Sequence, residues 1–361
     1  MESGPYFDTP EKSSAKKKPW LSWALIGLVV VAGFIAAYVP SPYLIERPGP
    51  VFNVLGNAGA TPIIQVVDSK SYPTDGALDL LTVNLAGSPG HTASWMEALL
   101  AWLDPSQALT PVDEIFPPNT NSNQVTKQNA LMMEDSQSQA TAAALRSLGY
   151  KYSYTVYVDT VDSRAAALGK IFAGDTIAAV NSTKVTGIDG LRTAVNAARG
   201  SAVTVSGLRN GKPFEVAVKP KLINKVWRLG VYVGTHFEFP IKVALNLSNV
   251  GGPSGGMMFA LGIYDKLTPG SLTGGQIFAG TGTIDELGQV GPIGGIRQKL
   301  YGAQRGGAKW FLAPAANCNE VVGHTPGGLN VVSVSNFSQA LKAVEQIAQT
   351  GSAAGLSTCK K

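Results

Sequence analysis

The sequence has few of the residues that bind metals or form disulfide frameworks. Its 361 residues include two cysteines, Cys318 and Cys359, and three histidines, His91, His236 and His324. These residues are scattered, with no CxxC pair and no histidine cluster, so we expect no metal site and no cofactor. The two cysteines either pair in an oxidising compartment or remain free thiols.

Nucleotide- and nucleic-acid-binding patterns are also missing. The chain has no GxxxxGK[ST] phosphate loop, which argues against an ATPase module and a nucleotide partner. The net charge of +5 is mild and includes lysines at both ends, Lys16 to Lys18 and Lys360 to Lys361. A charge placed in this way gives no broad basic surface, so we expect no nucleic-acid partner.

One long apolar run lies near the N-terminus. Leu21 to Val39 carries no charged residue and follows a lysine-rich segment. A bilayer-spanning helix needs about 20 apolar residues, and basic residues favour the cytoplasmic side. The sequence therefore predicts a cytoplasmic tail at 1–20 and a single-pass anchor at 21–39. Everything after Pro40 would then lie outside the cytoplasm, with the lipid bilayer as a partner. A cleaved signal peptide is the competing interpretation.

The next segment, 40–122, has β-strand patterns. Ile63 to Val67 and Ala77 to Val83 are rich in β-forming residues, and the apolar face of Ser94 to Trp102 predicts a helix. The polar stretch Pro117 to Gln124 is typical of a linker or exposed loop. Ser136 to Leu148 is Ala-rich, predicts a helix, and stops at a glycine.

The sequence pattern within 123–222 differs from that of the preceding segment. A strand at Tyr154 to Val161 precedes Gly174-Asp175-x-Ile177-x-x-Val180-Asn181, and Asn210-Gly211 joins two further strands as a hairpin. This order resembles a bacterial PDZ domain, although Ser163-Arg164-Ala165-Ala166 departs from the usual Ser-Pro-Ala. The resemblance implies peptide binding at a sheet edge, with Leu148-Gly149-Tyr150 as the candidate loop. The alternative is a β-rich spacer without a ligand.

A glycine-flanked serine stands between a strand-like run, Pro240 to Leu247, and an apolar run, Met257 to Ile263. In Gly251-Gly252-Pro253-Ser254-Gly255-Gly256 the proline favours a helix start, and glycines allow a sharp turn. A serine at a helix N-terminus lies where N–H groups stabilise negative charge, as acyl transfer requires. Taken alone, the stretch equally describes a Gly-rich structural loop.

A lysine downstream completes a possible pair. Lys299 falls in a helix that follows Gly294-Gly295, beside the apolar face made by Ile296 and Leu300. Lysine in a dry pocket has a lowered pKa, and its neutral amine can accept a proton from a serine hydroxyl. An ordinary surface lysine is the alternative interpretation.

These residues resemble the proteolytic domain of the Lon-type serine peptidases. The motifs are Gly252-Pro253-Ser254-x-Gly256, Thr281-Gly282-x-Ile284, and a run ending in Gly294-Gly295-Ile296-x-x-Lys299. The resemblance implies Ser254 as nucleophile and Lys299 as general base. Thr281 would orient the lysine amine, and the N–H of Ser254 and a nearby glycine, Gly252 or Gly255, would form an oxyanion hole.

The pattern also departs from that family. Lon proteins usually carry an acid where this chain has Gly251, and often Glu where it has Thr283. The whole chain looks like the membrane-anchored PDZ–Lon-like peptidases of bacteria, which lack the ATPase module. The resemblance further implies activity without ATP and a possible hexameric ring.

The predicted fold class is α+β, with a transmembrane helix, a PDZ-like β-rich domain and a Lon-type α/β proteolytic domain. The proteolytic domain is expected at 223–350, followed by a flexible tail at 351–361. The 40–122 segment is either its first part or a separate domain. We expect a serine endopeptidase that acts on protein or peptide substrates. The alternative is a non-catalytic peptide-binding scaffold on a peptidase fold.

Overall fold

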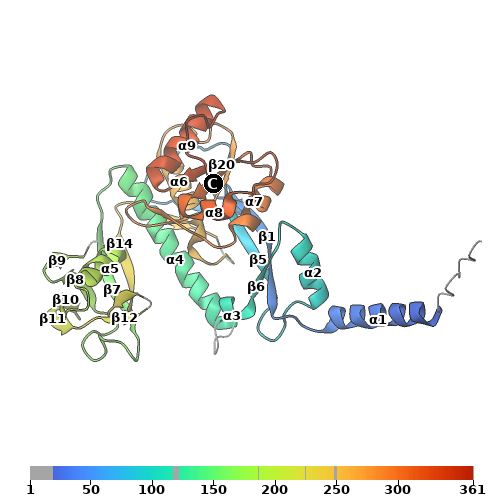
Figure 1. Cartoon of the computed structure of the whole chain (residues 1–361). Coiled ribbons are helices and arrows are strands. Elements are labelled where there is room, and N and C mark those ends of the chain that lie inside the picture. Colours follow the sequence, from blue (N-terminus) through green and yellow to red (C-terminus); the bar gives the residue numbers. More distant parts are fainter. Residues whose placement is uncertain (1–18, 117–121, 186, 224, 248–249, 361) are drawn as a thin grey trace, which may run out of the picture.

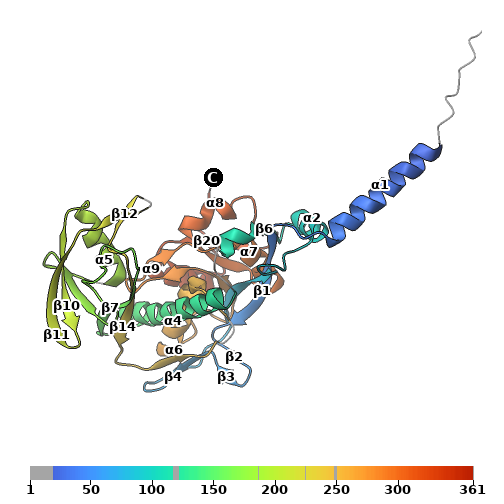
Figure 2. The same ribbon diagram turned by 90° about the horizontal axis from the view of Figure 1, so that it is seen from below.

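The computed structural model describes residues 19–116, 122–185, 187–223, 225–247 and 250–360. Figures 1 and 2 show a central α/β body, a smaller β-rich unit on one side, and helix α1 (Pro19–Tyr38) on the other. Most of the predicted tail at 1–20 and part of the predicted linker lie outside the described residues.

The central body is built on a six-stranded sheet with the order β20-β19-β16-β5-β1-β6. Three strands come from the N-terminal segment: β1 (Tyr43–Asn53), β5 (Ala77–Ala86) and β6 (Ala108–Pro111). The other three are β16 (Ile277–Gly280), β19 (Trp310–Pro314) and β20 (Asn330–Val334). β5 joins the two sets, because it pairs antiparallel with β1 and parallel with β16.

Helices cover both faces of this sheet. On one face, α4 (Ser122–Ser147), α6 (Gly256–Leu267) and α9 (Phe337–Thr350) bury one side of β5 in a core that includes Leu78, Leu80 and Phe259. On the other face, α7 (Ile296–Arg305) and α8 (Cys318–Val321) pack on Leu81 and Phe311. Adjacent residues of β5 pack into the cores on opposite faces of the sheet, because side chains alternate along a strand.

The smaller unit has its own sheet, with the order β11-β10-β8-β7-β14 and β9 added to β8. The strands are β7 (Ser153–Val161), β8 (Thr176–Val180), β9 (Thr183–Lys184), β10 (Val203–Arg209), β11 (Lys212–Val218) and β14 (Val231–Glu238). Helix α5 (Gly187–Ala197) packs on it through Leu191 and Val195. β12 (Lys221–Ile223) and β13 (Val226–Arg228) form a short hairpin beside it.

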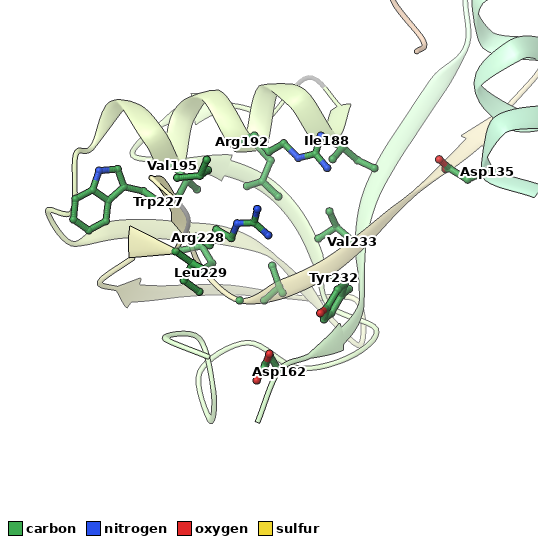
Figure 3. A pocket seen from close by; sticks show the side chains of 15 residues that line it. Asp135, Asp162, Ile188, Arg192, Val195, Trp227, Arg228, Leu229, Tyr232 and Val233 are labelled. Carbon is green, nitrogen blue, oxygen red and sulfur yellow. The ribbon is translucent and has the colours of Figure 1, made fainter. Parts of the chain in front are cut away.

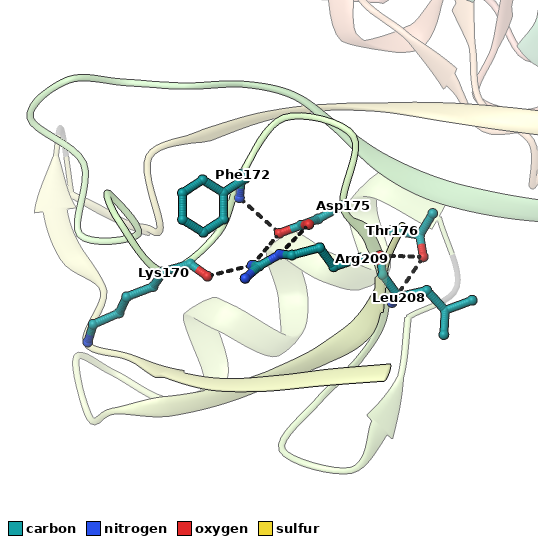
Figure 4. Close-up of polar contacts among 6 residues, drawn as sticks. All are labelled: Lys170, Phe172, Asp175, Thr176, Leu208 and Arg209. Atoms are coloured by element: carbon teal, nitrogen blue, oxygen red, sulfur yellow. Dashed lines mark hydrogen bonds and ion pairs between the residues drawn. The ribbon is translucent and has the colours of Figure 1, made fainter. Parts of the chain in front are cut away.

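The two motifs that suggested this unit contact each other (Figure 4). Arg209 donates through Nε to Asp175 Oδ1 at 2.8 Å and through Nη2 to Asp175 Oδ2 at 2.7 Å. Arg209 therefore holds the pKa of the Asp175 carboxyl below its usual range. Its guanidinium also lies over the rings of Phe172 and Phe214. This bidentate pair fixes the turn before β8 against the β10–β11 hairpin.

Several local predictions fall on observed elements with shifted ends. The helix expected at Ser94 to Trp102 is α2 (Trp95–Leu103), with Ser94 in a capping box with Glu97. The helix expected from Ser136 begins 14 residues earlier, so Ser122 to Gln124 are helical rather than a linker. Ile63 to Val67 corresponds to β4 (Ile64–Val66), which pairs with β15 (Val243–Leu245) and not with β5.

The remaining elements are short. They are β2 (Asn57–Ala58), β3 (Thr61–Pro62), α3 (Val112–Ile115), β17 (Thr283–Ile284) and β18 (Val290–Gly291), with the 3-10 turns η1 (Pro253–Gly255) and η2 (Ala315–Asn317). Cys318 and Cys359 form a disulfide, which resolves the two alternatives left by the sequence. It ties the C-terminal segment to α8, and Ser357 O accepts a bond from Ser333 N in β20.

The predicted transmembrane helix is wrong. Among the described residues, no helix combines the length and the apolar character needed to cross a bilayer. A span needs about 20 consecutive apolar residues in one helix. The segment expected at 21–39 instead belongs to α1, which starts at Pro19 and ends at Tyr38. The predicted fold class is therefore wrong in its transmembrane helix, and the predicted single-pass membrane location is wrong for the same reason.

Candidate active site

Ser254 lies in η1, directly ahead of α6, on the sheet face covered by α4. Gly252 precedes this turn with a φ of 85°, a backbone conformation that L side chains rarely adopt. Gly255 is buried, and a Cβ there would lie 2.4 Å from Leu80 Cδ1. The two glycines therefore allow the turn and bring the serine backbone close to β5.

The missing acid at Gly251 has a steric explanation. A Cβ at this position would lie 2.8 Å from Asn129 Cβ, which belongs to α4. The helix occupies the space that a larger residue needs. The neighbouring Gly252 N–H donates to Asn129 O at 2.9 Å, so it is already engaged and does not face an oxyanion. The Ser254 N–H, at the start of the helical segment, remains the better placed of the predicted donors.

Lys299 and Thr281 converge on Ser254. Lys299 Nζ lies 2.8 Å from Ser254 Oγ and 3.0 Å from Thr281 Oγ1. Thr281 follows β16, and its hydroxyl donates to Ser254 O at 3.0 Å. Because that hydroxyl proton is committed, Thr281 Oγ1 accepts from the lysine amine. The sequence predicted these three residues, and the structure brings their side chains into hydrogen-bond contact.

The lysine is almost fully enclosed. Its residue surface is 3% exposed, and this desolvation lowers the pKa of the ammonium group from 10.5 to about 7. Burial disfavours the charged form, and the two hydroxyl oxygens offset only part of that cost. Near neutral pH a large fraction of Lys299 is therefore an uncharged amine with a free electron pair. Such an amine beside a hydroxyl is suited to general-base chemistry.

Sequence reasoning missed the contribution of α4. Besides the Asn129 contact, Ser136 Oγ donates to Pro253 O at 2.9 Å. Asn129, Met133 and Ser136 lie on one face of the helix, so together they hold the segment that carries Ser254. Ser136 and Pro253 are 117 residues apart, and no local pattern signals such a contact. The helix thus acts as a clamp on the serine turn.

Removing the clamp hydroxyl should loosen the serine. We expect Ser136→Ala to lower kcat for peptide hydrolysis about tenfold, because small misplacements of a reacting group are costly. The fold should persist, since the second half of α4, from Gln139 to Leu145, stays buried. Steady-state kinetics measures the effect, with Ser138→Ala on the same helix as the control. Equal kcat values for the two variants would contradict the clamp.

The side chains open onto a groove of about 530 Å³. One wall is β5 from Leu80 to Asn84, and Met133 of α4 and Phe52 of β1 form others. Ser254 is half-buried, so its hydroxyl is accessible from this groove. β16 pairs with β5 only from Ala77 to Leu80, so the β5 backbone beyond Leu80 faces the groove. An extended chain fits such an edge.

A second groove of about 780 Å³ lies in the smaller unit, between α5 and β14 (Figure 3). β14 is the last strand of its sheet, so one of its edges faces this groove. The predicted peptide loop lies elsewhere: Leu148, Gly149 and Tyr150 end α4 in a helix-capping turn and do not line the groove. One sequence signal could have pointed to this groove: Leu229-Gly230 stands directly before a run of alternating β-forming residues.

The chain has low-scoring structural neighbours among PDZ domains. One is the PDZ domain of an SdrC-like protein from Listeria innocua, with 22% identity, a TM-score of 0.21, and coverage of 22% of this chain and 92% of that chain. Another is that of the SdrC-like protein from Listeria monocytogenes, with 20% identity, a TM-score of 0.21, and coverage of 22% and 85%. These scores are too low to carry an argument about function.

Residues 241–346 match the Lon protease (S16) C-terminal proteolytic domain. The Lon protease of Rickettsia felis is 35% identical over 109 residues, which cover 29% of this chain and 14% of that protein. The Lon protease of Buchnera aphidicola subsp. Acyrthosiphon pisum is 32% identical over 120 residues, covering 32% and 15%. The chain thus spans about one seventh of the length of these relatives. Within that span, the part containing Ser254, Thr281 and Lys299 is similar to a serine-peptidase proteolytic domain.

Proposed function

We propose that the protein is a serine endopeptidase in which Ser254 is the nucleophile and Lys299 the general base. The observation that carries this proposal is the 2.8 Å separation of Lys299 Nζ from Ser254 Oγ, with a lysine pKa lowered to about 7 by burial. Similarity of 241–346 to the Lon proteolytic domain supports the same reaction class.

The chemistry follows from the hydrogen bonds. Neutral Lys299 accepts the Ser254 hydroxyl proton as Oγ attacks the peptide carbonyl carbon. The resulting ammonium group then protonates the leaving amine, and an acyl-enzyme remains on Ser254. Lys299 next accepts a proton from water as the water oxygen attacks the ester carbon. The bond from that carbon to Ser254 Oγ then breaks, and the ammonium group returns the proton to Oγ. Thr281 fixes one amine N–H toward itself, which directs the electron pair to Ser254 Oγ.

Substrate would bind as an extended strand along β5. Backbone groups of Leu81 to Asn84 beyond the β16 pairing would hydrogen-bond to the peptide, and Phe52 and Met133 would contact its side chains. We also propose that the β1–β6 segment and the chain after β15 form one catalytic domain, with the β7–β14 unit inserted. Their shared six-stranded sheet supports this division.

The hydrolysis should need no nucleotide. Peptide-bond cleavage does not require ATP as a reactant, and the sequence contains no phosphate loop. The smaller unit would bind peptide segments in the groove between α5 and β14, at the free edge of β14. A non-catalytic scaffold is the second candidate, but no observation favours it over a serine and lysine in contact.

The test is covalent labelling with a fluorophosphonate, which reacts with activated serines, alongside cleavage of an unfolded protein without nucleotide. We expect the wild-type chain to be labelled at Ser254 and to cleave the substrate. Ser254→Ala should lose both properties, with Ser271→Ala, a serine outside the site, as the control. An unlabelled wild-type chain that binds peptides would instead support the scaffold.

A further inference from the structure

Most of the side chains that line the groove between α5 and β14 are apolar. Ile188, Leu191 and Val195 line it from α5, and Leu229, Val231 and Val233 line it from the strand side. Figure 3 shows Ile188 and Val195 on the helix side of the groove and Val233 on the strand side. An extended segment added to the β14 edge would place alternate side chains against this surface.

The two ends of the groove carry opposite charge. Arg228, next to Trp227, lies at the end where β14 begins, and Asp135 lies at the far end beyond Val233 (Figure 3). Arg192 of α5 also lines the groove, but it already interacts with another group of the chain. Asp162 also lines the cavity, but Figure 3 shows it below β14, away from α5, and its Oδ1 accepts from Arg164 N at 2.7 Å. The groove is therefore complementary to a peptide with a negative and a positive end.

These charges set the direction of the peptide. A C-terminal carboxylate would lie by Arg228 and the turn at Leu229-Gly230, where β14 starts. Gly230 has a φ of 79°, and a Cβ there would lie 2.6 Å from Ala165 Cβ, so this turn is tightly packed. With its carboxylate at this end, the peptide pairs antiparallel with β14, and the residues before its C-terminus extend toward α4.

Asp135 lies near Gly234 of β14. Tyr157 pairs with Gly234, and its ring would contact a Cβ at that glycine. Burial is the main cause of the raised pKa of the Tyr157 hydroxyl, and the carboxylates of Asp159, Asp135 and Glu134 add to it. Figure 3 places Asp135 beyond Val233, at the end of the groove where Gly234 follows in β14. Antiparallel partners advance one residue at a time, so a residue about three or four positions before the C-terminus would reach Asp135.

Asp135 belongs to the helix that clamps the serine turn. It is two residues from Met133, and a helix turns by about 200° over two residues. Met133 lines the active-site groove and Asp135 lines the second groove, so α4 separates the two. A tail held in the second groove would therefore leave it at α4, next to the catalytic body.

We propose that Asp135 is a specificity-determining residue: it selects substrate tails with a lysine or arginine about three or four residues before an apolar C-terminal residue. This inference rests on the proposed peptide binding by the smaller unit. Asp135 is an exposed residue and its carboxyl hydrogen-bonds to Gln139, so a basic side chain can still approach it from the groove. Glu134 on the next helix position does not line the groove.

The test measures binding of fluorescein-labelled ten-residue peptides to the full chain by fluorescence polarisation. All peptides end in valine and differ at the fourth residue from the end, which is lysine or glutamate. We expect the wild-type chain to bind the lysine peptide about three- to tenfold more tightly, the range of partly exposed charge pairs. Asp135→Asn should remove the preference, and Asp135→Lys should reverse it.

Glu134→Gln is the matched control, since it removes the neighbouring charge and should keep the preference. Circular dichroism melts establish that each variant is folded. An unchanged lysine-to-glutamate ratio in Asp135→Lys would overturn the proposal, as would equal binding of a peptide with an amidated C-terminus. If no peptide binds at all, the inference also fails, but fluorophosphonate labelling of Ser254 is unaffected and the proposed catalysis stands.

Discussion

Replacing Lys299 with methionine should abolish turnover and at the same time stabilise the protein. The wild-type chain buries an amine whose pKa falls from 10.5 to about 7. At neutral pH the lowered pKa means that burying this amine destabilises the folded state by about 4 kcal/mol, since one pKa unit corresponds to about 1.4 kcal/mol. The substitution removes that cost. Methionine has a similar length and no charge to desolvate.

The stability difference between Lys299→Met and the wild-type chain should depend on pH. Between pH 7 and 10.5 the unfolded chain binds more protons at Lys299 than the folded chain does, so wild-type stability rises with pH in that window. The advantage of Lys299→Met should therefore be largest near or below pH 7 and disappear toward pH 10.5. The wild-type kcat/KM should rise through about pH 7, as the free-enzyme amine loses its proton.

Urea unfolding at several pH values and a pH–rate profile measure both effects. Lys309→Met is the control, because Lys309 is exposed and should change neither stability nor turnover appreciably. A Lys299→Met variant that is less stable than wild type at pH 7 would contradict the desolvation argument. Residual turnover near the wild-type level would remove Lys299 from the mechanism.

Loss of the disulfide should give the second large effect. Cys318 and Cys359 close a loop with a sequence separation of 41. The chain-entropy treatment of such a loop gives about 4 kcal/mol, and measured values fall at or below this figure. We therefore expect Cys359→Ser to lower the free energy of unfolding by about 2–4 kcal/mol. Differential scanning calorimetry with and without dithiothreitol measures it.

Activity should respond as well, but less strongly. Asn317, beside Cys318, accepts from Ile293 N and donates to Ile293 O, both at 2.9 Å. Ile293 precedes the glycines that begin α7, the helix of Lys299. A less firmly held α8 would therefore disturb the position of Lys299 through the contact between Asn317 and Ile293. Dithiothreitol should leave Cys359→Ser unchanged, and a wild-type melting temperature that ignores dithiothreitol would show that the bridge contributes nothing.

The sequence predicted the residues that meet at Ser254 because each lies in a short glycine-rich motif with a strong local signal. It did not predict the contacts of Ser136 and Asn129 with the serine turn, or the true start of α4. The first half of that helix is polar and lacks a clear apolar period, and its contacts with the serine turn span more than a hundred residues. Gly251 looked like a missing acid, although α4 leaves no room there.

Other errors had different physical causes. The apolar composition of 21–39 suggested a membrane span, but the helix that includes it does not meet the requirements for crossing a bilayer. The resemblance to PDZ domains suggested Leu148-Gly149-Tyr150 as a peptide-binding loop, and that role stays a prediction. In the structure that glycine, with a φ of 80°, ends the helix. A local glycine signal thus identifies a turn but not its function.

The pairing of β5 with β16 also sets an order of events during synthesis. Ala77 pairs with Ile277, about 200 residues later, whereas the β7–β14 unit is continuous in sequence and has its own core. Contacts between distant residues form slowly, and local units fold first. The β7–β14 unit can therefore be complete on the ribosome while β5 still lacks its partner. Thr281 follows that partner directly, so the three residues proposed for catalysis would not meet until the six-stranded sheet closes.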